Sequence, residues 1–194
     1  PLIWLMSNRY MPDILGLAIV TIILYQLIRC SDNNLSLHSG YFLSGLLAGT
    51  RLSYLPIIII PFINQLINNP NRIKLISSFI LGILIWLIPL IWITGLDNLW
   101  IIATKQTYGH FMDFGGSIIT ENSLINRFSN LVESIWADGL GGYWIGRSLD
   151  TAIFSFFLAF IFIRGLITIY KNWKFEKYFK ILLGSLVLYL VWIF

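Results

Sequence analysis

The sequence predicts an all-α fold built from membrane-spanning helices, and three observations lead to that prediction. The 194 residues are 57% hydrophobic and only 11% charged, whereas a soluble domain carries about 25% charged residues. Apolar runs long enough for helices that cross a membrane recur between short polar segments. A longer and more polar segment, Leu96–Asp150, interrupts this pattern. We therefore expect a polytopic membrane protein with one long external loop that carries interfacial helices.

Charge and cysteine content narrow the functional classes. The formal charge of +4 does not indicate a nucleic-acid partner, because the basic residues occupy short loops between apolar runs, where they set orientation in the membrane. The single cysteine, Cys30, cannot form an internal disulfide. Both ends of the sequence, Pro1 and Phe194, lie in apolar runs, so we expect an internal fragment of a longer protein that forms one membrane domain over 1–194.

The first span is predicted at about 11–28, with a candidate site at its start. Pro12 suits the first helical turn, where an amide hydrogen is not needed. Asp13 directly precedes the apolar run Ile14–Ile28, so its side chain can cap the helix. Arg9 and Asp13 also place a cation and a carboxylate at the edge of hydrocarbon, which is costly and marks a functional candidate. The two roles for Asp13 are compatible.

The next apolar stretch, Gly40–Ile67, is predicted to be broken. As one helix it would be about 42 Å long, too long for a hydrocarbon core of about 30 Å, and it would hold Arg51 near its middle. We expect two short helices, about 40–50 and 55–67, with a turn around Arg51. Irregular backbone at this depth must be lined by protein or a watery cavity. Arg51 is therefore either a cavity residue or a snorkelling interfacial arginine.

The remaining spans and the basic loops predict an orientation. A polar loop is expected at Cys30–Ser39, and further spans at about 75–94, 151–169 and 181–194. If Gly40–Ile67 is broken, the basic loops fall on one side, which the positive-inside rule assigns to the cytoplasm. These loops contain Arg29, Arg72, Lys74, Lys171, Lys174, Lys177 and Lys180. The opposite, non-cytoplasmic face then receives Arg9, Asp13, Arg51 and the external segment 96–150.

Within the external segment, Leu124–Trp136 has apolar residues at helical spacing, and Asn122 or Ser123 can cap it. With its polar opposite face, it is expected to lie in the membrane interface. A second helix is expected at about Leu99–Thr107. After these come Tyr143 and Trp144, which can either stack on a sugar or join an interfacial aromatic belt.

His110 and Asp113 form the other polar pair of interest. They can either hold a substrate or make a hydrogen bond within the loop. A metal site is not expected, because no second histidine and no cysteine cluster accompanies them. No cofactor is predicted. No Ser-His-Asp set is credible, since His38 falls on the face opposite His110 and Asp113.

Two motifs resemble a known superfamily. Arg9-Tyr-Met-Pro-Asp13, opening an apolar helix, is similar to the second acidic motif of lipid-phosphosugar-dependent membrane glycosyltransferases. These form the GT-C superfamily, which includes protein O-mannosyltransferases and lipid A aminoarabinose transferases. Gly45-Leu-Leu-Ala-Gly-Thr-Arg-Leu-Ser53 resembles their Gly-rich short helix, with Arg51 at the position that is usually Lys. Gly109-His-Phe-Met-Asp-Phe-Gly-Gly116 also fits, less specifically.

The resemblance implies an inverting transfer of a sugar from a polyprenyl-phosphate carrier to an acceptor lipid, glycan or protein. The reaction would take place at the non-cytoplasmic face of a bacterial inner or plasma membrane. Asp13 would be a supporting catalytic carboxylate, and Arg51 and Arg9 would lie near the lipid phosphate. His110 and Asp113 would be weaker substrate contacts. The family's principal carboxylate lies in the first external loop, which we expect upstream of Pro1, so the fragment alone is expected to be inactive.

Two other functional classes fit the same residues. A transporter or flippase for a lipid-linked sugar would use the arginines for binding without chemistry, and broken helices are common in such proteins. A non-catalytic scaffold subunit would use the external segment to bind a partner. Formation of a glycosidic bond separates the transferase from both.

Overall fold

The structure is a computed structural model that describes residues 12–29, 33–113, 123–139, 141–146, 148–172 and 177–193. All regular structure in these ranges is helical, so the predicted all-α fold class is confirmed. The described residues form two compact units. One unit contains Ile88–Ile161, and the other contains the described residues up to Leu87 together with Phe162–Ile193.

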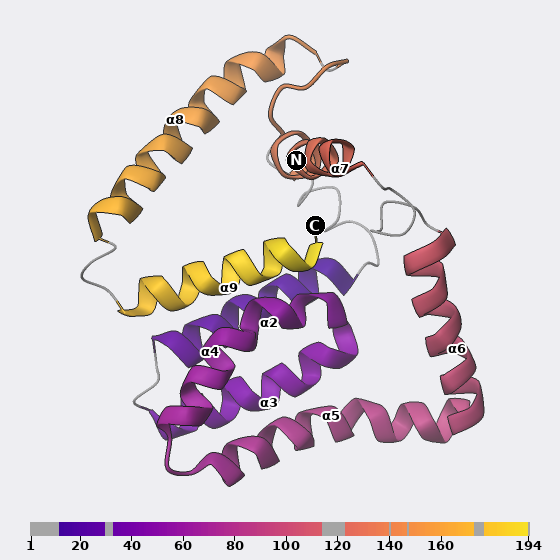
Figure 1. The fold of residues 1–194 in the computed structure, drawn as a ribbon. Coiled ribbons are helices and arrows are strands. Elements are labelled where there is room, and N and C mark those ends of the chain that lie inside the picture. The colour runs from indigo at the N-terminus through magenta and orange to yellow at the C-terminus, as the bar shows by residue number, and fades with distance from the viewer. Residues whose placement is uncertain are drawn as a thin grey trace. The chain divides into compact units, whose positions relative to one another are not determined.

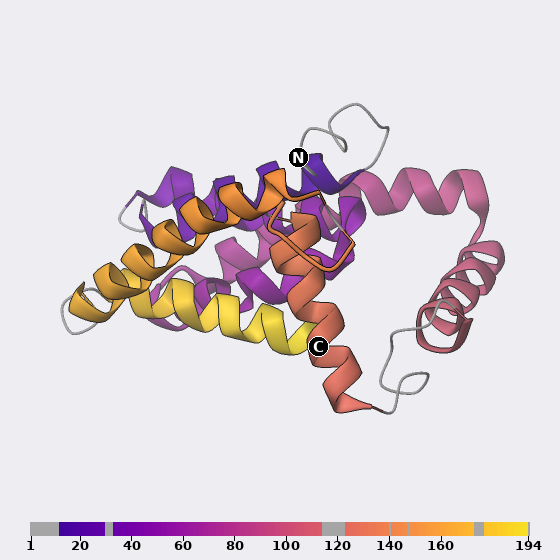
Figure 2. The same ribbon diagram turned by 90° about the horizontal axis from the view of Figure 1, so that it is seen from above.

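The second of these units is a helical bundle that contains the candidate residues Asp13 and Arg51. Figures 1 and 2 show α2, α3, α4 and α9 of this bundle lying side by side. The helices are α2 (Pro12–Ile28), α3 (Asn34–Thr50), α4 (Leu55–Asn68), α5 (Arg72–Thr94), whose last turns belong to the other unit, and α9 (Lys177–Ile193).

The core of the bundle is apolar and is centred on Tyr41 of α3. The Tyr41 ring packs against Phe62 of α4 with ring centroids 4.2 Å apart. Its hydroxyl donates a hydrogen bond of 2.6 Å to the carbonyl oxygen of Phe62, so the one polar atom of this buried ring is satisfied. The other fully buried apolar side chains around it are Ile23, Leu27, Leu37, Leu47 and Leu75.

Helices α3 and α5 cross with their backbones in contact. A Cβ atom added at Gly45 would overlap the carbonyl oxygen of Phe79, and one added at Gly82 would overlap that of Phe42. Trp86 of α5 donates from Nε1 to the carbonyl of Gly45 at 3.0 Å. Small residues allow such close approach between helices. These two glycines therefore fix where α5 lies against α3.

The other compact unit starts within the last turns of α5, at Ile88. Gly95 has φ +79, a left-handed conformation that suits glycine, and it turns the chain sharply into α6, Leu96–Tyr108 (Figure 1). A π-helical turn, Gly109–Asp113, extends α6. The unit also contains α7 (Leu124–Glu133), a second π-helical turn (Ser134–Gly139) and the first part of α8 (Asp150–Asn172).

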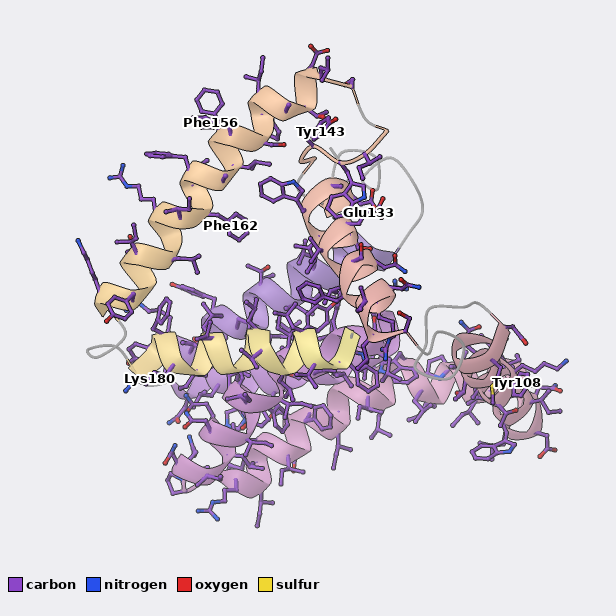
Figure 3. The ribbon with its side chains drawn as sticks, turned by 45° about the horizontal axis from the view of Figure 1, so that its top comes forward. Tyr108, Glu133, Tyr143, Phe156, Phe162 and Lys180 are labelled. Carbon is purple, nitrogen blue, oxygen red and sulfur yellow. The ribbon has the colours of Figure 1, made fainter. Side chains whose placement is uncertain are left out.

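Two helices in the described part of the chain are long and apolar enough to cross a membrane: Arg72–Thr94 and the Asp150–Thr168 part of α8. In the most apolar window of each, the share of buried residues is 6% and 0%, respectively. Figure 3 shows Phe156 and Phe162 projecting from different sides of α8. Shorter apolar helices cover Ile14–Ile28, Leu52–Asn68 and Tyr178–Trp192.

Some predicted boundaries are wrong. The loop expected at Cys30–Ser39 is helical from Asn34 onward, because the Asn33 side chain accepts the backbone N–H of Leu35 at 3.0 Å and caps α3. Asp13 was predicted to cap α2. Since α2 begins at Pro12, Asp13 is instead its second residue.

The helices expected in the external segment are present with shifted ends. The helix predicted at Leu99–Thr107 begins earlier, at Leu96. The helix predicted at Leu124–Trp136 is capped by Ser123, as expected, but changes to π-helical geometry after Glu133. A helix end depends on local hydrogen bonds that the apolar spacing does not reveal.

We predict that Gly82→Ala destabilises the bundle by about 2 kcal/mol, because the added methyl group overlaps backbone that cannot rotate away. The matched control is Gly165→Ala in α8, where an added Cβ meets no atom within 4 Å. There the higher helix propensity of alanine should stabilise by up to about 1 kcal/mol. Thermal unfolding in detergent measures both. Equal midpoints for the two variants would contradict the backbone crossing.

Candidate functional site

The candidate site lies at a chain reversal between α3 and α4. Arg51 has an extended backbone, with φ −156 and ψ 90, and its N–H donates to the carbonyl of Leu47 at 2.8 Å. A 3-10 turn, Leu52–Tyr54, then leads into α4. Pro56 favours the break here, because near the start of α4 it needs no amide hydrogen, whereas α4 and α5 accommodate Pro61 and Pro89 within continuous helices.

The start of α2 contacts this reversal at Gly16. A Cβ added there would lie 2.9 Å from two ring carbons of Tyr54 and 3.1 Å from Cβ of Arg51. Asp13 lies three residues before Gly16, which is about one turn of α2. The structure therefore brings the first turn of α2, with Asp13, and the Arg51 turn to the same end of the bundle.

A third helix reaches the same place. Tyr189 of α9 packs against Tyr54 with ring centroids 6.2 Å apart and planes inclined by 56°. Tyr54 thus lies between Gly16 of α2 and Tyr189 of α9, directly beside Arg51. Arg51 itself is exposed. The turn that carries Arg51 is thus packed against α2 at Gly16 and against the Tyr189 ring of α9.

Sequence reasoning missed Gly16, Tyr54 and Tyr189. Gly16 did carry a signal, because a glycine one turn after a candidate acid in an apolar run permits close approach of another segment. Nothing in the sequence indicates Tyr189, because its contact depends on how α9 packs along α4.

The basic helix ends lie at the other end of the bundle. Gln65 of α4 donates from Nε2 to the carbonyl of Leu27 at 2.7 Å, so α2 and α4 finish side by side. Arg29 follows the first of these ends. Arg72 bonds to the carbonyl of Ile67 at 2.9 Å beside the second. Arg51 is therefore separated from Arg29 and Arg72 by the length of the bundle.

The other predicted site residues, apart from Asp13 and Arg51, lie outside the described residues or in the other compact unit. Arg9 lies outside the described residues, as do the side chains of Asp13 and His110. His110 and Asp113 belong to the π-helical turn after α6, in the other compact unit. A π-turn has i→i+5 hydrogen bonds, so residues three apart are not stacked as they would be in an α-helix. Within the described ranges, no group of three or more His, Cys, Asp or Glu is placed to hold a metal.

The glycine-rich stretch after the second π-turn packs on Trp136. A Cβ at Gly142 would lie 2.4 Å from Nε1 of the Trp136 ring. The Trp136 Nε1 donates to the carbonyl of Tyr143 at 3.2 Å, and the backbone N–H of Tyr143 donates to Oγ of Ser155. Gly142 therefore serves close packing on an aromatic ring, while Tyr143 keeps 40% of its surface exposed.

Comparisons with protein-family models, curated proteins and solved structures find no match for this chain. The functional argument therefore depends on the residues and geometry of the chain itself.

We predict that Gly16→Ala and Tyr54→Ala are coupled. Gly16→Ala alone presses a methyl group against the Tyr54 ring and Arg51, and should destabilise by about 1–3 kcal/mol. In a Tyr54→Ala background most of that cost should disappear, giving a coupling energy of about 1 kcal/mol or more. The four unfolding free energies of the cycle measure it. The control pair, Gly165→Ala with Tyr54→Ala, should be additive, and additivity in the Gly16 cycle would refute the contact.

Proposed function

We propose that this chain is part of a membrane glycosyltransferase that moves a sugar from a polyprenyl-phosphate carrier to an acceptor at the non-cytoplasmic face. The observation that carries the proposal is the contact of α2 with the Arg51 turn at Gly16. The two motifs that resemble the GT-C superfamily are 37 residues apart in sequence, counting from Asp13 to Thr50. In the folded chain the first turn of α2, where the first motif ends, lies at the same end of the bundle as the Arg51 turn, which supports the proposal.

The surface of the long helices supports insertion into a membrane. In a water-soluble fold, apolar helices of this length are mostly buried. Here α5 and α8 expose bulky apolar side chains along their length. Examples are Ile80, Ile85, Trp92, Phe156 and Ile163. Hydrocarbon is the environment that satisfies such surfaces, and the intrahelical hydrogen bonds satisfy the backbone there.

The orientation follows from the two ends of the bundle. The end with Arg29, Arg72 and Lys74 would face the cytoplasm by the positive-inside rule. Asp13 and Arg51 would then lie toward the opposite face. The strongly amphipathic α7, which exposes Leu124, Ile125 and Phe128, suits a position in a membrane interface.

The reaction assigns a role to each charged group. An acceptor hydroxyl attacks the anomeric carbon of the sugar, and the bond from that carbon to the carrier phosphate breaks with inversion. Arg51, and Arg9 four residues before Asp13, would neutralise the departing phosphate. A carboxylate accepts the hydroxyl proton. By the resemblance, Asp13 would support the principal base, and His110 and Asp113 would be weaker substrate contacts.

We predict that Asp13→Asn in the full-length protein lowers sugar transfer by about a hundredfold or more without changing the unfolding midpoint, because the side chain keeps its shape and loses its charge. The matched control is Asp97→Asn in the first turn of α6, which should keep transfer near the original rate. The assay incubates membranes with a panel of radiolabelled polyprenyl-phosphate monosaccharides and measures released polyprenyl phosphate and glycosylated product.

The same assay separates the other functional classes. Movement of the labelled carrier across the membrane without a glycosidic bond would identify a transporter. If the carrier is neither moved nor consumed, a scaffold role is the better explanation. Transfer that is unchanged in Asp13→Asn would remove Asp13 from the mechanism.

A second variant series tests Arg51. Arg51→Gln removes the cation and should lower the rate of transfer by about a hundredfold. Arg51→Lys keeps the charge but cannot make bidentate hydrogen bonds to the phosphate, so it should retain about a tenth of the rate. Arg164→Gln in α8 is the control for loss of an arginine and should retain full activity. A measurement of transfer rate at saturating carrier distinguishes the three variants. Equal rates for Arg51→Gln and the control would exclude Arg51 from the site.

A further inference from the structure

The end of the bundle opposite Arg51 gathers cations from several helices. Arg29 follows α2, while Arg72 and Lys74 lie in the first turn of α5, and all three are exposed. The contact of Gly184 with Ile60 and that of Tyr189 with Tyr54 make α9 antiparallel to α4. The beginning of α9 therefore lies toward the same end, and Figure 3 labels Lys180 in its first turn.

Hydrogen bonds between helices hold this end together. Gln65 of α4 bonds to the carbonyl of Leu27 in α2 at 2.7 Å. Gln26 of α2 donates to Oγ of Ser39 in α3 at 3.1 Å. His38 of α3 and Ser78 of α5 are joined through Nδ1 and Oγ at 2.8 Å. The cations therefore lie on helix ends that are joined to one another by hydrogen bonds, rather than on separate loops.

The charge of this end is not balanced by the described part of the bundle. Between residues 12 and 87 and between 162 and 193, Asp13 is the one carboxylate in the described ranges, and it lies at the opposite end. Asp32 and Glu176 lie near these helix ends in sequence but outside the described residues. The field at this end is therefore positive along its described surface.

Helix dipoles add to this field. Helices α3, α5 and α9 all begin at this end, and none has an acidic residue in its first turn. A helix N-terminus carries partial positive charge and favours an anion. Arg72 and Lys74 in the first turn of α5 oppose the dipole of their own helix. A bound anion would relieve that repulsion and pair with the cations at once.

We propose that this end of the bundle binds the phosphate groups of anionic lipid headgroups. The positive charge indicates an anionic ligand. The cations also lie at the end of a helix with exposed apolar side chains, namely Ile73, Ile76 and Ile80 of α5. A lipid satisfies both features, with its phosphate at the basic end and its chains along the helices. The proposal depends on membrane insertion, as set out under the proposed function, but not on sugar transfer.

The test uses the purified full chain in neutral detergent with phosphatidylglycerol or phosphatidylcholine, and counts bound lipid by native mass spectrometry. Phosphatidylglycerol should bind more tightly, and added salt should reduce the difference. Arg72→Gln/Lys74→Gln should weaken phosphatidylglycerol about fivefold for each cation, or about twenty-five-fold in all. Lys105→Gln/Arg164→Gln, which removes the same charges elsewhere, should leave binding within about twofold of the original.

Each remaining outcome gives a decision. Equal affinity for the two lipids, or equal weakening by both double variants, would overturn the proposal. Inorganic phosphate that displaces phosphatidylglycerol at equal concentration would assign the site to a soluble anion instead. Arg72→Lys/Lys74→Arg guards against misfolding, because it keeps the charge and should restore binding. The lipid-binding assay contains no sugar donor, so its result does not depend on sugar transfer. If Asp13→Asn loses transfer in the other assay but still binds phosphatidylglycerol here, the lipid site and the catalytic site are separate.

Discussion

The chain reversal at Arg51 is the constraint on which the rest of the bundle depends. Pro56 favours a new helix start after the Arg51 turn, because at the beginning of α4 it needs no amide hydrogen to donate. The chain therefore turns through the short segment that contains Arg51 and returns as α4. This reversal makes α2 and α4 finish at one end, and it leaves Arg51 at the other end against the first turns of α2.

Close approach of backbones, more than bulky side chains, sets the positions of the helices. Gly45 and Gly82 let α3 and α5 touch, and Gly16 lets α2 touch the Arg51 turn. A methyl group at any of these positions would move a helix or a ring. Tyr41 also helps to position the helices, because its hydroxyl donates a hydrogen bond from α3 to the backbone of α4 inside an apolar core. Small residues and a satisfied polar atom therefore determine the geometry on which the proposed site depends.

The two ends of the bundle have different chemistry, and this difference links the two proposals. One end combines Arg51 with the turn that carries Asp13, which suits a reaction in which a phosphate departs while a hydroxyl loses a proton. The other end presents Arg29, Arg72 and Lys74, which suits stable attraction to phosphate without a reaction. An anchored basic end would fix the depth of the bundle, and with it the depth at which the Arg51 end meets a lipid-linked substrate.

The sequence by itself determined the helical class, the break around Arg51 and the grouping of Arg29, Arg72 and Lys74 on one side, because these follow from apolar spacing, helix length and local charge. It did not determine where α3 begins, because several polar residues before this helix can cap it and the sequence does not show that Asn33 is the one that does. Only the tertiary structure decided that Gly16, Tyr54 and Tyr189 meet beside Arg51. Those contacts depend on which helices pack together, and no local pattern encodes a pairing between residues 16, 54 and 189.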